Sequence, residues 1–535
     1  MENAVFSGIK EKYDNIDKRI KMCFLSAFIC GLFAHIYALT NHLYNYDELW
    51  HTPTGFGTGT QMGRWGLSVL AWLTKVFFDD VYTIPVINGL ISIVCYALLA
   101  CIVVDLFEIN EQYFACIVGA IIVTFPSVVC RMFYMFTTHY YAIGELIAAI
   151  GVLILFKCKN KIIGIPISFI CVIFGTSVYQ AVFATITCMI LGKLIVLLIT
   201  EKHMFNQIIK KCTGYFMFLA TSMAGYLISN KVALVVTGLQ MDKHAENYDA
   251  MGQITFEQLI MSLRHCYASF FKAGFRDVYS MNPNIIVRSA FWISVIVIAY
   301  ICIKIVCCQY DISQKILILL AISVLPVAIF LVYIMVASSG VMYSIMTFDT
   351  VFLIVIPLAM LKASENLENC KTPVILIDKV VNYIVAISLA GTVLSYIWFA
   401  NGNYLAMEYT NQHDNAYYQT LMTQIKSVDG YHADMPITMI GKPIVDSTYT
   451  KQDMIGETFD LAGKGSTNIN AYSSWNIMTR VLGYDPVNRN SDEEEEYFRE
   501  LDEVVNMPCY PSSGSIKIID DTIVIKFQEP SELEQ

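Results

Sequence analysis

Residues 84–107 read IPVINGLISIVCYALLACIVVDLF, and the one charged residue in this run of 24 is Asp105, close to its end. A helix needs about 20 predominantly apolar residues to cross the hydrocarbon core of a bilayer. The run therefore predicts a transmembrane helix. Ten more segments meet or nearly meet the same criterion, so we predict an α-helical polytopic membrane protein with about eleven spans; the other ten are 20–40, 113–130, 138–156, 162–175, 178–200, 212–238, 286–307, 315–337, 346–362 and 379–400.

Charge is scarce in this chain and unevenly distributed. Charged residues make up 15% of the 535 positions, against about 25% in globular proteins. Residues 1–400 contain 26 Lys and Arg against 23 Asp and Glu, whereas residues 401–535 contain 9 against 22. We therefore predict a membrane domain over 1–400 and a small acidic domain over 401–535. Nucleic-acid partners are not expected, because they select basic surfaces.

The basic residues of the loops predict the orientation of the spans, because Lys and Arg accumulate in cytoplasmic loops. With the N-terminus inside, the inner segments carry sixteen basic residues and the outer segments eight. The N-terminus is therefore predicted to be cytoplasmic. Eleven spans place the C-terminal domain outside, whereas an even number would leave it in the cytoplasm. The loop 41–83, the segment 131–137, the turn 176–180 and the loop 239–285 then lie on one outer face.

The first outer loop, 41–83, contains the adjacent carboxylates Asp47 and Glu48. Two interpretations are open. In one, the carboxylates are ordinary hydrated loop residues. In the other, one of them is a general base that takes the proton of an acceptor hydroxyl. Its neighbour then orients the acceptor or binds a divalent cation such as Mg²⁺ or Mn²⁺.

The same loop continues through several glycines to Gly63-Arg64-Trp65. The planar guanidinium of Arg64 suits a phosphate group, to which it can donate two parallel hydrogen bonds. From Trp65 onward, apolar residues recur at helical spacing, which predicts an amphipathic helix in the membrane interface. Such a helix would hold Arg64 at the depth of a lipid phosphate. These residues therefore favour a site that binds a sugar-phosphate and activates an acceptor hydroxyl.

The order of the motifs resembles that of a known family, the bacterial type II Gtr glucosyltransferases of the GT-C fold group. The resemblance covers most of the chain, including its C-terminal domain. It is carried by Asn45-x-Asp47-Glu48, Gly63-Arg64-Trp65, Ser177-Val178-Tyr179-Gln180 and Tyr510-Pro511-Ser512-Ser513-Gly514-Ser515-Ile516.

This resemblance implies an enzyme of the bacterial inner membrane with an extracytoplasmic active site. Such an enzyme takes a sugar, by family default glucose, from a polyprenyl-phosphate carrier and passes it to a cell-surface or lipid-linked glycan, such as an O-antigen. The family's acidic residues fall on Asp47 and Glu48, and its Gly-Arg-Trp falls on Gly63, Arg64 and Trp65. We therefore predict a one-step displacement with inversion, with Asp47 or Glu48 as the base and Arg64 at the departing phosphate.

Other polar residues near the outer face are weaker candidates. Arg131 and Lys231 would bind the donor phosphate, although basic side chains at span ends commonly extend to the interface without any ligand. For Arg131 that alternative is favoured. His139 and Tyr140, at the entry to the fourth span, are candidates for substrate binding. Glu145 lies inside that span, where an ionisable group is costly and a functional role is a reasonable hypothesis.

Two further pairs complete the candidates for substrate binding. Tyr179 and Gln180 interrupt an apolar run and would line a cavity, because polar groups at membrane depth need partners. Arg264 and His265 lie in the longest outer loop, on a helix predicted over 256–271.

The C-terminal domain reads as mixed α/β. Helices are predicted over 410–427 and 492–506, and a short strand over 436–441. The apolar runs 516–519 and 523–527, on either side of Asp520-Asp521, predict a hairpin.

Two alternatives of other functional classes remain open. A lipid-linked glycan transporter or flippase would place its decisive charges within the spans and often shows internal repeats. A non-catalytic scaffold for polysaccharide assembly would use the acidic domain as a binding module and would not depend on Asp47 or Glu48.

Overall fold

The computed structural model describes residues 14–201, 205–242, 254–275, 284–307, 312–336, 347–365, 372–443, 468–469, 473–484 and 492–529. The chain divides into two compact units. Unit 1 comprises Met1–Asn41 and Phe56–Asn401, and unit 2 comprises His42–Gly55 and Gly402–Gln535. The sequence places 42–55 in a loop of the membrane domain, but Tyr44 and Leu49 of this segment belong to the apolar core of unit 2.

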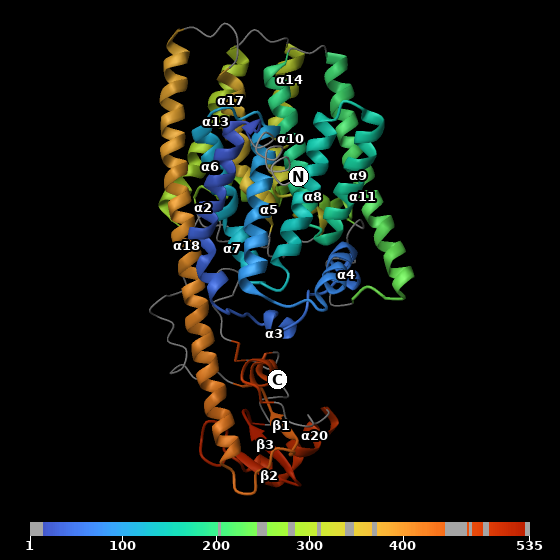
Figure 1. Cartoon of the computed structure of the whole chain (residues 1–535), viewed down its shortest axis with the longest axis vertical. Helices are drawn as coiled ribbons and strands as arrows, with labels where there is room; N and C mark the ends of the chain where they lie inside the picture. Colours follow the sequence, from blue (N-terminus) through green and yellow to red (C-terminus); the bar gives the residue numbers. More distant parts are fainter. Residues whose placement is uncertain are drawn as a thin grey trace, which may run out of the picture. The chain divides into compact units, whose positions relative to one another are not determined.

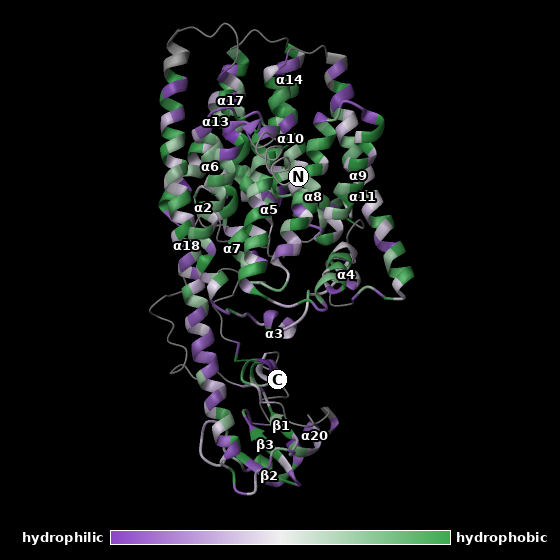
Figure 2. Ribbon diagram, viewed as in Figure 1, coloured by the Kyte–Doolittle hydropathy of each residue, from purple (hydrophilic) through white to green (hydrophobic). Residues whose placement is uncertain are grey.

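The regular elements of unit 1 in the described ranges are helices (Figure 1). The helix α18 continues past the unit boundary without interruption, and hydrophilic residues predominate in its C-terminal half (Figure 2). Besides the short 3₁₀-helices η1 (Thr60–Met62) and η2 (Phe348–Val351), the helices are α2 (Lys18–Thr40), α4 (Trp65–Phe78), α5 (Pro85–Leu106), α6 (Gln112–Thr124), α7 (Pro126–Met132), α8 (Thr138–Lys157), α9 (Lys161–Val178), α10 (Val182–Thr200), α11 (Phe205–Thr237), α12 (Phe256–Lys272), α13 (Ile285–Cys307), α14 (Ile312–Ser323), α15 (Leu325–Ile329), α16 (Val332–Met335), α17 (Phe352–Glu365) and α18 (Thr372–Lys426).

Ten helices in the described part of the chain are long and apolar enough to cross a membrane. They coincide with ten of the eleven predicted segments, and the short segment 162–175 is a full helix, Lys161–Val178. The remaining segment, 346–362, contains α17, which has 14 residues. A helix of that length rises about 21 Å, less than the roughly 30 Å of the hydrocarbon core. The protein is therefore a polytopic membrane protein with ten candidate spans among its described residues.

The helix predicted after Arg64 is confirmed as α4. Trp72, Val76 and Phe77 on this helix are exposed, whereas Leu67 and Ala71 are buried against the rest of unit 1. An exposed apolar face beside a bundle of membrane-spanning helices is typical of a helix that lies in the membrane interface.

Small residues allow α8 and α9 to approach closely. A Cβ atom built on Gly175 of α9 would lie 2.5 Å from the carbonyl oxygen of Gly144 and 2.6 Å from the Cβ of Ala148, both on α8. Helices in membranes commonly pack through such small residues, because close backbones gain dispersion contacts. This contact matters for the site, since α9 ends one residue before Tyr179.

Unit 2 contains a three-stranded sheet in the order β1-β3-β2. The strand β1 (Ile437–Ile440) pairs in parallel with β3 (Thr522–Lys526), with Ile437 opposite Ile523. The strand β2 (Ile516–Ile519) pairs antiparallel with β3, which confirms the predicted hairpin. Asp520 and Asp521 adopt positive φ angles of 48° and 58° in the turn, as two-residue hairpin turns require.

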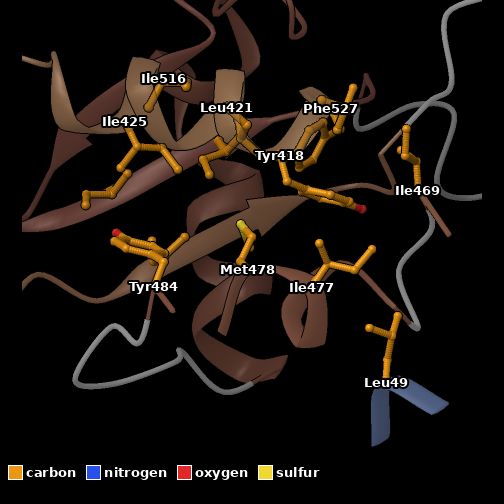
Figure 3. Packing of buried hydrophobic residues seen from close by; sticks show 14 of the residues in the cluster. Leu49, Tyr418, Leu421, Ile425, Ile469, Ile477, Met478, Tyr484, Ile516 and Phe527 are labelled. Atoms are coloured by element: carbon orange, nitrogen blue, oxygen red, sulfur yellow. The ribbon is translucent and has the colours of Figure 1, made fainter. Parts of the chain in front are cut away.

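Helices complete unit 2. The predicted helix 410–427 is the end of α18, and the predicted helix 492–506 is divided into α20 (Asp492–Glu500) and α21 (Asp502–Val505). The helices α19 (Ser474–Asn476) and η5 (Ile477–Val481) pack beside the sheet core. Leu49, from the short helix α3 (Glu48–His51), lies among the buried residues of this core (Figure 3).

We expect Gly175→Ala to destabilise unit 1. The added methyl group meets the backbone of Gly144, so α8 and α9 must separate, and overpacking of this kind costs about 1–3 kcal/mol. Thermal unfolding of the purified protein in detergent measures the effect. Gly214→Ala on α11 is the matched control, because nothing lies within 4 Å of a Cβ at that position. Equal unfolding temperatures for the two variants would contradict the prediction.

Candidate functional site

The backbone around Arg64 is fixed by side chains from distant parts of unit 1. Gly63 has a positive φ of 74°, a conformation that favours glycine. The amide of Gln180 donates to the Met62 carbonyl at 2.6 Å, and the Tyr226 hydroxyl donates to the Gly63 carbonyl at 3.0 Å. A Cβ on Gly63 would lie within 3 Å of both of these side chains. A glycine is therefore required immediately before Arg64.

The side chains of Arg64 and Trp65 are also held. The Arg64 guanidinium donates to the Tyr141 hydroxyl at 3.2 Å and lies over the Tyr179 ring, 5.1 Å from its centroid. The rings of Tyr141 and Tyr179 stack on each other at 4.6 Å. The Trp65 indole donates to the Ser229 hydroxyl at 3.2 Å. The arginine is thus pre-oriented among aromatic rings, and its planar guanidinium can donate two parallel hydrogen bonds to a phosphate.

A buried ion pair supports this arrangement. The Arg131 guanidinium donates two hydrogen bonds to the Glu145 carboxylate, at 2.9 and 3.2 Å, and both residues are completely buried. Arg131 also donates to the Tyr96 hydroxyl, and Thr185 donates to Glu145 at 3.1 Å. The Arg131 guanidinium lies 5.7 Å from the centroid of the Tyr179 ring. Tyr179 is therefore within cation–π distance of both Arg64 and Arg131.

The favoured interpretation of Arg131 as a side chain that extends to the lipid interface is wrong, because the side chain is buried and paired with Glu145. A buried guanidinium needs a compensating charge, and Glu145 supplies it. The role of Arg131 as a ligand of the donor phosphate stays a prediction.

The other predicted residues of unit 1 lie in several places. His139 is buried and its ring lies 3.8 Å from that of Tyr140, whose hydroxyl donates to Thr74 of α4 at 2.8 Å. Tyr140 therefore ties α8 to α4. Lys231 is exposed on α11.

Arg264 and His265 lie on α12, which packs against α15 and α16. The Arg264 side chain is exposed, and the His265 ring lies 5.6 Å from that of Tyr333. Their predicted role in substrate binding stays a prediction.

Asp47 and Glu48 lie in a tight turn of unit 2. The Asn45 carboxamide oxygen accepts hydrogen bonds from the backbone amides of Asp47, at 2.8 Å, and Glu48, at 3.0 Å. This pattern is an Asx-type cap that fixes the start of α3. Glu48 is completely buried, whereas Asp47 is partly exposed. The two adjacent carboxylates thus have different access to solvent.

The end of α3 has an unusual protonation equilibrium. Burial, assisted by the positive charge of Arg480, lowers the pKa of His51 to about 4. Burial also lowers the pKa of His42. His51 is therefore neutral at pH 7, and its protonation opposes the packing of this segment.

Sequence reasoning missed Tyr96, Tyr141, Thr185, Tyr226 and Ser229 as parts of the site. The available signal was the occurrence of polar residues within apolar runs, which at membrane depth must find partners. That signal does not say which partners they find. For metals, no group of three or more His, Cys, Asp or Glu lies together in the ranges that the structure describes.

Comparison with known proteins gives one match. A family model described as Glucosyl transferase GtrII matches residues 36–356, which include Asp47, Glu48, the Gly63-Arg64-Trp65 segment and the Arg131–Glu145 pair. The match ends before the C-terminal motif at residues 510–516. No curated protein and no solved structure matches the chain significantly.

We expect Glu145→Leu to destabilise unit 1 by about 3–5 kcal/mol, because it leaves the Arg131 charge buried without its carboxylate. The double variant Arg131→Met/Glu145→Leu removes both charges and should recover part of the loss. Thermal unfolding in detergent gives the comparison. A double variant less stable than Glu145→Leu would show that the ion pair does not govern stability here.

We expect the stability of unit 2 to fall as the pH is lowered from about 6.5 to 4. The unfolded chain takes up a proton on His51 near its ordinary pKa of about 6.5, whereas the folded chain does so only near 4, so acid favours unfolding. At pH 5 the loss is on the order of 1 kcal/mol. His51→Gln should show a smaller loss, and His432→Gln, at an exposed position, should retain the dependence of the wild type. Thermal unfolding at pH 7 and 5 tests this, and equal losses in wild type and His51→Gln would contradict it.

Proposed function

The chain belongs to the glucosyl transferase GtrII family and is a membrane glycosyltransferase, and we propose that it transfers glucose from a polyprenyl-phosphate carrier to a glycan outside the cytoplasm. The acceptor is a cell-surface or lipid-linked glycan, with an O-antigen as one candidate. Membership in this family favours the transferase over the transporter and the scaffold that the sequence left open.

The observation that carries the proposal is the fixed pose of Arg64. Its backbone is held by Gln180 and Tyr226, and its guanidinium by the Tyr141 hydroxyl and the Tyr179 ring. A donor group that is already oriented loses little entropy when it binds a developing charge. Arg64 directly precedes α4, whose apolar face is exposed. We infer that α4 lies in the interface and holds Arg64 at the level of the carrier phosphate.

The proposed reaction is a single displacement. Asp47 removes the proton of an acceptor hydroxyl, and the oxygen attacks the anomeric carbon of the sugar. The bond from that carbon to the phosphate oxygen breaks, the configuration inverts, and polyprenyl phosphate leaves with Arg64 stabilising its charge. Asp47 is the better base of the two carboxylates, because it is partly exposed whereas Glu48 is completely buried. Glu48 then orients the turn or the acceptor, with or without a divalent cation.

The proposed location follows from charge distribution. The excess of basic residues in the predicted inner loops favours a cytoplasmic N-terminus, which puts the 41–83 loop on the extracytoplasmic face of the bacterial inner membrane. With the ten candidate spans alone, residues 402–535 would lie in the cytoplasm, although they belong to the same unit as residues 42–55. The proposal therefore also counts the predicted segment 346–362 as a crossing. A lipid-linked donor is consistent with this side, because nucleotide sugars are cytoplasmic compounds.

We expect Asp47→Asn to lower kcat at least 100-fold, because general base catalysis typically contributes 10²- to 10⁴-fold. The assay uses purified full-length protein in detergent, polyprenyl-phosphate glucose and a crude envelope glycan, and it measures acceptor-dependent release of polyprenyl phosphate. Asp79→Asn is the matched control, since Asp79 lies in the same loop, is exposed and has a positive φ of 64° that asparagine tolerates.

The same assay tests the arginine and the choice of base. Arg64→Lys keeps the charge but loses the planar fork, so we expect a reduced kcat with normal unfolding temperature. Arg131→Met/Glu145→Leu tests whether Arg131 has a role in donor binding beyond stability. Near-wild-type turnover in both Asp47→Asn and Glu48→Gln would overturn the proposed mechanism.

A further inference from the structure

The segment that carries the predicted catalytic carboxylates begins with a residue fixed by α18. The backbone amide of Tyr44 donates to the Asn411 side-chain oxygen at 3.1 Å, and the Asn411 side-chain amide donates to the Tyr44 carbonyl at 2.8 Å. The Tyr44 hydroxyl also donates to Asn415, one turn further along α18, at 2.8 Å. Asn411 is 5% exposed. Two antiparallel hydrogen bonds to one residue fix both the position and the direction of its backbone.

The fixed backbone of Tyr44 also limits where the carboxylates of Asp47 and Glu48 can lie. Asn45 follows Tyr44, is buried, and accepts hydrogen bonds from the amides of Asp47 and Glu48. The amide of Leu49 then donates to the Asn45 carbonyl at 3.2 Å. The backbone amides of Asp47, Glu48 and Leu49 are therefore all bonded to Asn45, which directly follows the residue that Asn411 holds.

The other end of the segment is held by a second element of unit 2. Arg480 of η5 donates from one guanidinium nitrogen to the carbonyl of Trp50, at 2.8 Å, and to that of Thr52, at 3.1 Å. Leu49 packs into the apolar core together with Ile477 of the same element. The turn is thus held before Asn45 by α18 and after Glu48 by η5, from sequence positions more than 350 residues away.

We propose that Asn411 and Arg480 are positioning residues for the Asp47–Glu48 turn, and that the C-terminal unit is thereby a working part of the catalytic centre; its catalytic consequence rests on the proposed function of Asp47. Neither residue touches substrate in this proposal. They act by holding the carboxylate in the orientation that proton removal requires. A displacement of about 1 Å at a reacting group can cost about 100-fold in rate, so hydrogen bonds remote from the chemistry have a measurable effect on kcat.

The contacts favour this role over simple stabilisation of unit 2. Arg480 is exposed and donates to the backbone carbonyls of Trp50 and Thr52. Both polar atoms of the Asn411 side chain form hydrogen bonds with the backbone of Tyr44. These bonds order the 42–55 segment specifically. The sheet of unit 2 is held by the backbone ladders of its own strands, so it should persist when these side-chain bonds are removed.

The test compares Asn411→Ala, Arg480→Ala and Arg480→Lys with wild type, using the full-length protein. Arg499→Ala is the matched control, because Arg499 lies on α20 in the same unit and pairs within its own helix with Glu495. Two quantities are measured: kcat and KM in the release assay described above, and hydrogen exchange of peptides from 42–55 and from the strands 437–440 and 516–526.

We expect faster exchange in 42–55 with unchanged exchange in the strands. We also expect kcat to fall roughly 100-fold for Asn411→Ala and roughly 10-fold for Arg480→Ala, with the KM for the donor within about threefold of wild type. Arg480→Lys should recover most of the loss, because an ammonium group can still donate to both carbonyls. The control should match wild type in both measurements.

Two outcomes overturn the inference. Unchanged exchange in 42–55 shows that these residues do not hold the turn, and this result does not depend on any activity. Faster exchange with unchanged kcat shows that the hold has no catalytic consequence. Failure of the proposed function is separate, because it appears as no acceptor-dependent release of polyprenyl phosphate by the wild-type protein, whereas a wrongly assigned base appears as full turnover in Asp47→Asn. Asn411 is buried, so Asn411→Ala is the more prone to misfold. Arg480 is exposed, so the Arg480 variants test the inference even if Asn411→Ala does not fold.

Discussion

Four helices of unit 1 meet at a buried ion pair. Tyr96 of α5, Arg131 of α7, Glu145 of α8 and Thr185 of α10 form a single hydrogen-bonded group. In a low-dielectric interior a lone guanidinium is costly, and a carboxylate that accepts two hydrogen bonds from it offsets much of that cost. The apolar surfaces of these helices give little orientation by themselves, since lipid solvates them equally well. The polar group therefore specifies how four helices are arranged, and the Tyr179 ring is placed against it.

Two separate sets of contacts hold the residues of the predicted site. Arg64 is held within unit 1 by Gln180, Tyr226, Tyr141 and Tyr179. The carboxylates are held within unit 2, where Asn45 caps their turn. The segment passes from one unit to the other after Gly55, where unit 2 ends and Phe56 belongs to unit 1. A short stretch of sequence thus contains two elements of the predicted site, and each is held by a different unit.

The sequence predicts where the helices lie but not which side chains pair between them. The spans follow from composition alone, because about 20 apolar residues have few other stable arrangements; ten of the eleven segments are helices of sufficient length. The hairpin followed from two apolar runs around Asp520-Asp521. By contrast, the Arg131–Glu145 pair joins residues 14 positions apart on two helices, and Asn411 meets Tyr44 across 367 positions. No periodicity in one sequence encodes such pairings, and for Arg131 the local rule for span ends gave the wrong interpretation.

The different supports of Arg64 and Asp47 are compatible with the chemistry of the proposed substrates. A polyprenyl-phosphate donor is confined to the bilayer, and its phosphate is reachable only near the interface, so its ligand belongs on a membrane-bound element such as the segment before α4. A glycan acceptor is strongly hydrated and approaches from water, so the base that meets its hydroxyl must be reachable from solvent. Asp47 meets this requirement, because it is partly exposed within unit 2 while Glu48 beside it is buried. The two reactants of the proposed transfer come from different solvents, and the residues assigned to them are anchored accordingly.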